Sequence, residues 1–319
     1  MAVYTKVSAE QIDAFLTRFD VGTLVSAKGI AEGVENSNYL IETTQDRFIL
    51  TLYEKRVDPD DLPFFIAMLD HLAAKNCPVP PMIADRNNVK IQELCGRSAC
   101  LIKFLPGISV TVPTAAQAEA TGRALGDMHE ALKDFTGTRP NSMNHDTWRQ
   151  LAKDCGPDEL DAIASGLHDL VESELDHLDA HWPDDLPQSV IHADLFPDNV
   201  LMLDDQVTGL IDFYFSCTDV RAYDLAVTHS AWCFSDDGSQ FDANVSTALM
   251  RGYLETFALS TQECAALPIL ARGASLRFML TRAYDWINTP ADALVTRKDP
   301  TAFLKRLTFY QNNPDIFNR

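Results

Sequence analysis

The spacing of hydrophobic and polar residues changes character near residue 105. Before that point apolar residues recur at short spacing in runs such as YLIETTQDRFILTLYE and VKIQELCGRSACLIKFL. Such runs are typical of β-strands with one buried face. Each run is divided by a turn, Thr44-Gln45-Asp46 in the first and Cys95-Gly96-Arg97 in the second, so each predicts two strands. The first third of the chain should therefore form a small, mainly antiparallel sheet.

Two helices are predicted within this β-rich part. Ser8-Ala9-Glu10-Gln11 has the spacing of a capping box. The helix should end near Asp20. Four apolar residues recur in it at helical spacing: Ile12, Phe15, Leu16 and Phe19. A second helix is expected over about residues 60–75. The first third of the chain should thus contain helices as well as the small sheet.

Beyond residue 105 the pattern is mainly helical. Phe104-Leu105-Pro106-Gly107 is a turn signal, and helices are expected at about 114–133, 157–182, 240–257 and 268–287. The exception is VIHADLFPDNVLMLDDQVTGLIDFYFS, residues 190–216, where strands at 200–203 and 207–211 flank Asp204-Asp205-Gln206. The sequence predicts an α+β protein with two lobes, residues 1–104 and 105–319.

Composition and charge exclude several classes of function. The chain has 46% hydrophobic and 23% charged residues, which is typical of a folded globular protein. Its net charge of −20 disfavours nucleic acid and anionic membranes as partners. We find no signal peptide and no apolar run that approaches the length of a membrane span. The seven cysteines are scattered and lack metal-binding spacing. We expect a cytoplasmic protein that holds any anionic substrate through metal ions or a local positive field.

Residues 190–216 concentrate polar chemistry in an otherwise apolar segment. The predicted hairpin places Asn199 at the start of one strand and Asp212 at the end of the next, so the two side chains can lie close together. Such a pair can hold a divalent cation. Asp194 lies on the loop before the hairpin, with His192 packing or bonding beneath it. Taken singly, Asp194 and Asp198 could equally be turn residues and Asp212 a strand-end cap.

The motif from His192 to Asn199, followed by Ile211-Asp212-Phe213, resembles the catalytic and metal-binding loops of the protein-kinase-like superfamily. Its form is similar to the aminoglycoside phosphotransferase and choline kinase branch. The resemblance implies a protein-kinase-like fold, with a small antiparallel-β lobe that binds nucleotide and a larger helical lobe that carries the acceptor site. It implies ATP and Mg²⁺ as cofactors, with Asp194 as catalytic base and Asn199 and Asp212 holding Mg²⁺. For His192 we expect a structural hydrogen-bonding role.

The same resemblance indicates where nucleotide would bind. Residues 33–39 are similar to the nucleotide-binding loop of this branch, which points to Gly33, Asn36 and Ser37. Phe104 and Leu105 fall at the hinge, against which an adenine could stack and hydrogen-bond. A tight hairpin turn and an ordinary interdomain turn are the alternatives for these two segments.

One position departs from the resemblance. Thr51 stands where most relatives carry a Lys or Arg that contacts the nucleotide phosphates, and the helix over residues 60–75 offers no clear Glu partner. Either Mg²⁺ does more of the work, or another cation such as Lys55 or Lys28 substitutes.

Longer stretches resemble bacterial homoserine kinases of the phosphotransferase-like type. The resemblance runs from about residue 30 to residue 310 and includes CGRSACLIKFLPG, DFYFSCTDVRAYDLAV and LRFMLTRAYDW. It implies transfer of phosphate from ATP to L-homoserine, giving O-phospho-L-homoserine, a step in threonine synthesis. Periodicity and spacing alone do not distinguish homoserine from choline, ethanolamine or methylthioribose.

An amino-acid acceptor requires a cation for its carboxylate and an acid for its ammonium group. Arg277 and Arg282 lie about 140° apart on one predicted helix, so they should not share a pocket, and one of them should bind the carboxylate. We favour Arg282. Either could instead form a surface ion pair, for instance Arg282 with Asp285. Asp219 or Asp224 could bind the ammonium group, and Asp224 could equally be a helix cap or brace.

Two other functions remain open. One is a different small-alcohol kinase of the same fold, acting on choline, ethanolamine or an aminoglycoside. The other is a catalytically silent nucleotide-binding scaffold, which the departure at Thr51 favours and the intact set of Asp194, Asn199 and Asp212 opposes. A protein kinase is disfavoured, since the sequence has no Ala-Pro-Glu segment.

Overall fold

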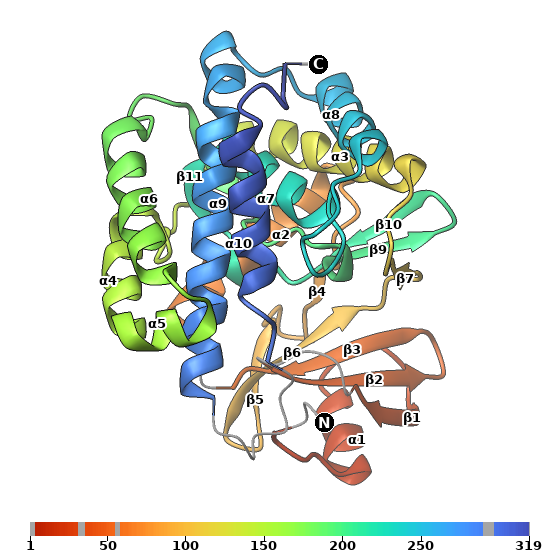
Figure 1. Cartoon of the computed structure of the whole chain (residues 1–319). Helices are drawn as coiled ribbons and strands as arrows, with labels where there is room; N and C mark the ends of the chain where they lie inside the picture. Colours follow the sequence, from red (N-terminus) through yellow and green to blue (C-terminus); the bar gives the residue numbers. More distant parts are fainter. Residues whose placement is uncertain (1–3, 31–35, 55–57, 290–296, 319) are drawn as a thin grey trace. The chain divides into compact units, whose positions relative to one another are not determined.

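A computed structural model describes residues 4–30, 36–54, 58–289 and 297–318. The chain divides into two compact units, an N-terminal unit over Met1–Pro106 and a C-terminal unit over Gly107–Arg319 (Figure 1). The sequence placed this division after residue 104, within the same turn.

The N-terminal unit is built on an antiparallel sheet with strand order β1-β2-β3-β6-β4, in which β5 also pairs with β6 (Figure 1). The two predicted strand pairs are confirmed as β2 with β3 and β5 with β6. The strands are β1 (Leu24–Gly29), β2 (Ser37–Thr43), β3 (Arg47–Leu52), β4 (Met82–Ile83), β5 (Ile91–Leu94) and β6 (Arg97–Lys103).

Helix α1 (Ala9–Leu16) starts at the predicted capping box, in which the side chains of Ser8 and Gln11 each bond the other's backbone. It ends at Leu16, earlier than the expected Asp20, although Phe19 is still buried. The apolar face of α1 packs on the sheet and forms one core with residues such as Ile41 and Leu50. The second predicted helix is confirmed as η1 (Pro59–Asp61) followed by α2 (Leu62–Ala74).

The C-terminal unit is mainly helical, and α9 and α10 pack side by side in it (Figure 1). Its helices are α3 (Ala115–Ala131), η2 (Leu132–Asp134), α4 (His145–Cys155), α5 (Pro157–Ile163), α6 (Leu167–His181), η3 (Pro197–Asn199), η4 (Phe213–Phe215), α7 (Arg221–Trp232), α8 (Ala243–Thr256), α9 (Thr261–Asn288) and α10 (Thr301–Asn312).

The helix predictions for this unit are partly wrong. The single helix expected over residues 157–182 is two, α5 and α6, because Gly166 adopts a left-handed conformation with φ +75° between them. Helix α9 begins at Thr261 rather than near residue 268, since Ser260 and Glu263 form a capping box and Pro268 is accommodated within the helix. Helices α4, α7 and α10 were not predicted.

Two small antiparallel sheets hold the polar segment. The predicted hairpin is confirmed as β9 with β10, which extends to β7, and the second sheet pairs β8 with β11. The strands are β7 (Ile108–Ser109), β8 (Gln188–Ile191), β9 (Val200–Leu203), β10 (Gln206–Leu210) and β11 (Cys217–Val220). Because the chain passes from β8 to β9 and from β10 to β11, these sheets fix both ends of the loops that carry Asp194 and Asp212.

Helix α9 corrects one expectation from the sequence. By length and composition it could cross a membrane, although no apolar run was expected to approach that limit. In the structure 67% of its most apolar window is buried inside the protein. The helix therefore has the burial of a core helix, and its inner face supports the site described below.

Candidate active site

His192 ties together the two loops that carry the predicted catalytic and metal-binding residues. Its buried imidazole donates from Nε2 to the carbonyl oxygen of Ile211 at 3.0 Å, next to Asp212. Its Nδ1 accepts the backbone N–H of Asp194 at 3.3 Å. Burial lowers the pKa of His192, which keeps the ring neutral. These contacts agree with the structural role predicted for it.

Asp224, in α7, braces the start of the catalytic loop. Its carboxylate accepts the backbone N–H groups of His192 at 2.7 Å and Ala193 at 2.8 Å, and His129 Nε2 lies 3.0 Å away. Burial tends to raise the pKa of Asp224, but the hydrogen bond and charge of His129 outweigh it and the pKa is lowered. The carboxylate is fully buried and bonded within the unit, and its predicted contact with a substrate ammonium group stays a prediction. The alternative, a brace, describes its contacts.

Asp194 and Asn199 are joined directly. The side-chain nitrogen of Asn199 donates to the backbone oxygen of Asp194 at 2.8 Å and to its carboxylate at 3.2 Å. Burial raises the pKa of Asp194 to about 8, and the negative charges of Asp212 and Asp198 add to this while Arg277 and Lys298 oppose it. A carboxylate whose pKa lies near neutrality is suited to accept a proton from a hydroxyl group.

Asp212 adopts a left-handed backbone conformation, with φ +64°, at the point where the chain leaves β10. The neighbouring backbone N–H of Ile211 donates to the carbonyl oxygen of Asn199 at 3.0 Å, so the hairpin brings the two residues together as predicted. A non-glycine residue in this conformation is uncommon, and such strain is concentrated at functional sites.

Asn199 and Asp212 have the donor chemistry that Mg²⁺ prefers. The Asn199 amide nitrogen faces Asp194, which directs its carbonyl oxygen away from that carboxylate. With the carboxylate of Asp212 this gives two oxygen donors. Within the described ranges no group of three or more His, Cys, Asp or Glu is arranged to hold a metal ion. A cation here would therefore complete its shell with phosphate oxygens or water.

Arg277 is buried and bonds the backbone of the catalytic loop. Its Nη1 donates to the carbonyl oxygen of Ala193 at 2.7 Å, and its guanidinium carbon lies 4.3 Å from the centre of the Phe278 ring. In the part of the chain that the structure describes, its Nε has no hydrogen-bond partner. The pKa of the buried Tyr223 hydroxyl is raised mainly by burial, and Arg277 lowers it in part. Arg277 thus leaves polar capacity unused beside Asp194.

Arg282 lies on the same helix, and Asp194 and Asp198 both act on its charge. It donates to the backbone oxygen of Asp299 at 3.4 Å and lies over the ring of Phe303 at 4.5 Å, not in the alternative ion pair with Asp285. Burial, followed by the charge of Arg306, lowers the pKa of Arg282 to about 10. Arg277 and Arg282 bond different backbone oxygens, those of Ala193 and Asp299, and the expectation that they do not share one pocket stays a prediction.

Asp219, in β11, lies at the edge of the same region. Its carboxylate accepts from the side-chain nitrogen of Asn141 at 2.6 Å and from the backbone N–H of Val220 at 2.7 Å. It is only partly buried. Asp219 therefore stays a candidate for the ammonium group. Asn141 was not predicted, since no motif surrounds it and its partner is distant in sequence.

The predicted nucleotide-binding side chains of the N-terminal unit have structural partners. Gly33 lies outside the described residues, as does Lys55. Ser37 Oγ accepts the backbone N–H groups of Tyr4 and Thr5 at 2.9 and 3.0 Å and donates to Glu54 at 2.7 Å. Asn36 is buried, and its side-chain oxygen lies 3.4 Å from the backbone nitrogen of Glu54. Any phosphate contact by Asn36 and Ser37 would therefore come from their backbone amides.

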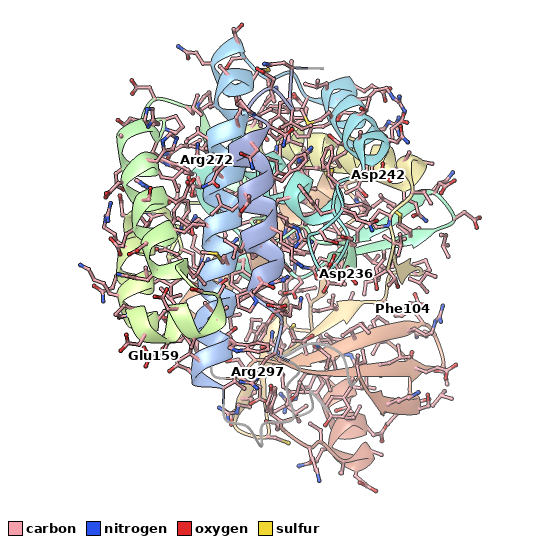
Figure 2. The ribbon with its side chains drawn as sticks, in the orientation of Figure 1. Phe104, Glu159, Asp236, Asp242, Arg272 and Arg297 are labelled. Carbon is pink, nitrogen blue, oxygen red and sulfur yellow. The ribbon has the colours of Figure 1, made fainter. Side chains whose placement is uncertain are left out.

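Thr51, at the departure from the family pattern, is buried in β3. Its hydroxyl donates to the side-chain oxygen of Asn38 at 2.8 Å. Lys28 is exposed on β1. At the predicted hinge lies Phe104 (Figure 2). The guanidinium carbon of Arg47 is 4.3 Å from the centre of its ring, and Leu105 is partly buried. The nucleotide-binding role of Phe104 and Leu105 stays a prediction.

Lys298 was missed by the sequence analysis. Its Nζ lies 3.7 Å from the Asp198 carboxylate, in the catalytic loop. A single lysine outside any motif gives no signal in the sequence, because its partner lies far away along the chain.

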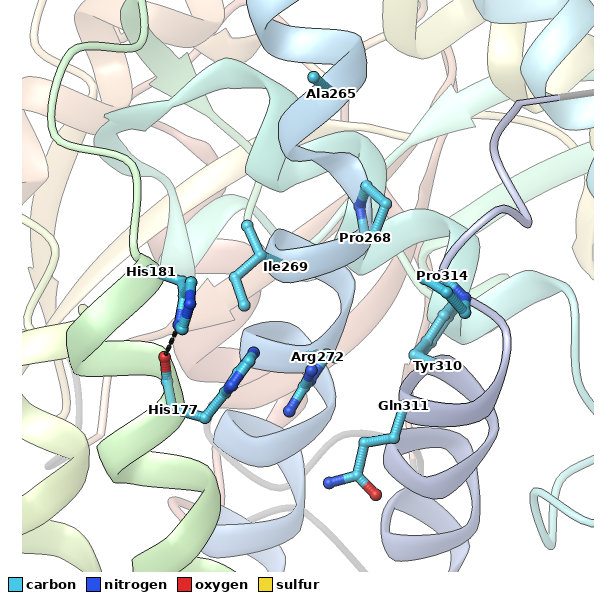
Figure 3. A pocket seen from close by; sticks show the side chains of 9 residues that line it. All are labelled: His177, His181, Ala265, Pro268, Ile269, Arg272, Tyr310, Gln311 and Pro314. Carbon is cyan, nitrogen blue, oxygen red and sulfur yellow. Dashed lines mark hydrogen bonds between the residues drawn. The ribbon is translucent and has the colours of Figure 1, made fainter.

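A cavity and a network of ion pairs lie outside this region. A cavity of about 230 Å³ between α6, α9 and α10 contains none of the predicted site residues (Figure 3). Its lining is His177, His181, Ala265, Pro268, Ile269, Arg272, Tyr310, Gln311 and Pro314.

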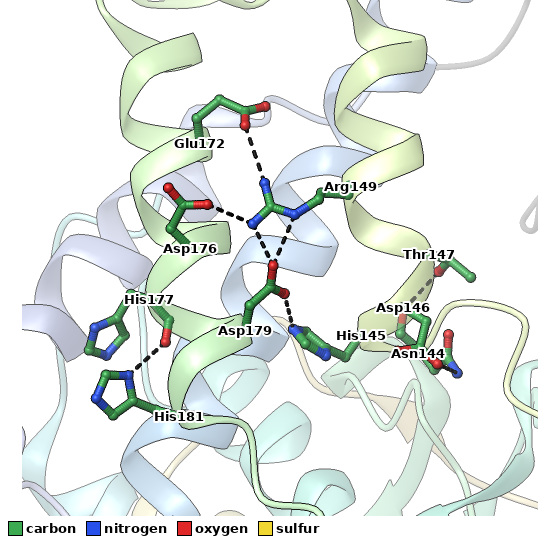
Figure 4. A network of polar contacts seen from close by, with 10 residues as sticks. All are labelled: Asn144, His145, Asp146, Thr147, Arg149, Glu172, Asp176, His177, Asp179 and His181. Atoms are coloured by element: carbon green, nitrogen blue, oxygen red, sulfur yellow. Dashed lines mark hydrogen bonds and ion pairs between the residues drawn. The ribbon is translucent and has the colours of Figure 1, made fainter.

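In the network of ion pairs, Arg149 of α4 pairs with three acids of α6, Glu172, Asp176 and Asp179 (Figure 4). This network joins two helices and is structural.

Comparison with known proteins identifies the family and the fold of this chain. Residues 26–259 match the model of the phosphotransferase enzyme family. The chain is 56% identical to the homoserine kinase of Zymomonas mobilis, over 98% of this chain and 97% of that protein, and 51% identical to the homoserine kinase of Xanthobacter autotrophicus, over 98% and 96%. An amicoumacin kinase has a similar fold, with a TM-score of 0.71 at 14% identity over 98% of this chain and 94% of that one. This confirms the predicted α+β, protein-kinase-like fold. The chain belongs to the phosphotransferase enzyme family.

Proposed function

We propose that this protein transfers the γ-phosphoryl group of ATP to the hydroxyl group of L-homoserine. The identity to proteins named homoserine kinase, which extends over nearly the full length, supports the substrate. The observation that carries the reaction type is the joined arrangement of Asp194, Asn199 and Asp212. This arrangement also opposes a silent scaffold, since each of the three side chains has the chemistry that phosphoryl transfer requires.

Asp194 would act as the catalytic base. In the transfer a bond forms between the homoserine hydroxyl oxygen and the γ-phosphorus, and the bond from that phosphorus to the β–γ bridging oxygen breaks. The bridging oxygen leaves with the electron pair as part of ADP, and the hydroxyl proton passes to Asp194. The hydrogen bond from Asn199 and the brace at Asp224 hold this carboxylate and its loop in place before substrate arrives.

Asn199 and Asp212 would hold Mg²⁺ through their side-chain oxygens. A bound Mg²⁺ ion supplies charge neutralisation for the phosphate oxygens. The amicoumacin kinase of similar fold was solved with AMP-PNP and Ca²⁺, which supports a nucleotide and a divalent cation in this fold. We infer that ATP is the donor here and that the N-terminal unit binds it through the segment from Gly33 to Ser37 and through Phe104 and Leu105.

Arg282 would bind the carboxylate of homoserine and Asp219 its ammonium group. Arg282 carries a charge that no described acid pairs with directly, and it is accessible enough to meet a ligand. Arg277 is assigned instead to positioning, because it is buried and bonds the backbone of Ala193. Choline, ethanolamine and aminoglycosides lack a carboxylate, so this assignment favours homoserine over them. We place the reaction in the cytoplasm.

The test is a coupled assay of ADP release with homoserine, choline, ethanolamine and kanamycin as separate acceptors. Homoserine should give the largest kcat/KM. Faster turnover of one of the other acceptors would replace the proposed substrate, and no ADP release with any of them, while ATP still binds, would support the silent scaffold.

A further inference from the structure

The phosphoryl group needs a cation that the expected position does not provide. Thr51 is uncharged, buried and bonded to Asn38, so β3 offers no positive charge there. The protein as a whole carries a net charge of −20, and three of its acids, Asp194, Asp198 and Asp212, lie on the two loops of the site. Because the transferred group is itself an anion, positive charge near this loop should matter for the reaction.

Lys298 places its ammonium group against the catalytic loop. Nζ lies 3.7 Å from the carboxylate of Asp198 and 5.8 Å from the centre of the Phe196 ring. Both partners fall between Asp194 and Asn199 in the sequence. Lys298 therefore lies beside the loop that carries the catalytic carboxylate.

The residues on either side of Lys298 are held by their side chains. Arg297 donates to the carbonyl oxygen of Trp286, near the end of α9, at 2.9 Å, and lies over that indole ring. Asp299 accepts the backbone N–H of Thr301 at 2.8 Å, at the start of α10. Lys298 is therefore presented from a fixed position, and only its side chain needs to move.

The ion pair with Asp198 is weak enough to exchange. The side chains of Lys298 and Asp198 are 62% and 64% exposed, and ion pairs this exposed contribute little to stability. Arg277, by contrast, is buried and held by the backbone of Ala193. The exposed side chain of Lys298 can therefore turn toward a phosphate, whereas that of Arg277 is fixed.

We propose that Lys298 leaves Asp198 and contacts the γ-phosphoryl group during transfer, supplying the positive charge that Thr51 lacks. This inference rests on the proposed function, since it requires a phosphoryl group at Asp194. Asp198 holds the ammonium group beside the loop between turnovers.

The test compares four variants by steady-state kinetics with ATP and homoserine. Lys298→Gln removes the charge, Lys298→Arg keeps it, and Asp198→Asn removes the ion-pair partner alone. Lys305→Gln is the matched control, because Lys305 forms a similar exposed pair with Asp237 at 3.5 Å. Lys298→Gln should lower kcat by about 10- to 100-fold with the KM for homoserine within about threefold. Lys298→Arg should recover most of the loss, and Lys305→Gln should stay within about threefold of wild type. Asp198→Asn should lower kcat much less than Lys298→Gln does, because the ammonium group is still present.

A second measurement follows the affinity for ADP with aluminium fluoride, which stands in for the phosphoryl group, in the presence of homoserine and Mg²⁺. Lys298→Gln should weaken this complex by about 10-fold or more while affinity for ADP alone is unchanged. Equal losses in Lys298→Gln and Asp198→Asn would overturn the proposal, since the ion pair would then act only by holding the loop. A wild-type kcat in Lys298→Gln would overturn it too. If wild type phosphorylates a different alcohol, the proposed substrate fails, and the same comparison is made with that acceptor.

Discussion

Replacing Asp224 with asparagine should destabilise the protein strongly, although the change removes little volume. The carboxylate accepts two backbone N–H groups and lies 3.0 Å from His129, and it is fully buried. An amide has one acceptor oxygen, so one buried N–H loses its partner, at a cost of about 1–3 kcal/mol. The remaining bonds lose their charge assistance, which brings the expected loss to about 3–5 kcal/mol of unfolding free energy.

Chemical denaturation of the full chain, followed by tryptophan fluorescence, measures this loss. Asp205→Asn is the matched control, because Asp205 lies exposed in the turn between β9 and β10 and its replacement should change the free energy by less than about 0.5 kcal/mol. The lowered pKa of Asp224 adds a second signature. Its stabilising contribution is present above the unfolded pKa of 3.8 and is lost as pH falls through the lower folded value, so the gap between wild type and variant should be full at pH 7 and narrow in acid. A loss below about 1 kcal/mol at pH 7 would refute the brace.

Three further predictions concern other residues of the C-terminal unit. Asp212→Asn should weaken nucleotide binding in the presence of Mg²⁺ while leaving Mg²⁺-free binding unchanged in calorimetry, and an unaltered Mg²⁺ requirement would count against a metal ligand. Arg282→Ala should raise the KM for homoserine by about 10- to 100-fold with the KM for ATP unchanged, whereas a parallel rise in both would show a general defect. Burial lowers the pKa of His229 to about 3 from 6.5, so this neutral ring stabilises the protein above pH 6.5 and the contribution is lost as pH falls toward 3. In His229→Asn the decline of unfolding free energy with acid should be shallower than in wild type by about 1.4 kcal/mol per pH unit, and equal slopes would exclude this origin.

Local patterns predicted the parts of the fold that local physics determines. The capping box at Ser8 and Gln11 and the hairpin from residue 200 to 210 formed as expected, because neighbouring residues alone specify them. A comparable signal, Ser260 with Glu263, was present at the start of α9 but was obscured by Pro268. Helix α7 gave no amphipathic pattern, because its residues from Ala222 to Trp232 are all buried.

The structure brings predicted site residues together where they are close in sequence. Asp194, Asn199 and Asp212 belong to one motif, and the hairpin between them brings them together. The role of Asp224 depends on hydrogen bonds to a loop about thirty residues earlier, and that of Lys298 on a partner about one hundred residues earlier. Contacts at such distances depend on how helices pack, which periodicity in a single sequence does not encode.

The central claim is that Asp194 accepts the proton as ATP phosphorylates homoserine. It is tested most directly by following product formation with phosphorus NMR in wild type and Asp194→Asn, with ATP affinity measured in parallel by calorimetry. Wild type should convert homoserine to O-phosphohomoserine, and the variant should lose nearly all turnover while it binds ATP about as tightly as wild type. Turnover in the variant within about tenfold of wild type, or no phosphohomoserine from wild type, would contradict the account.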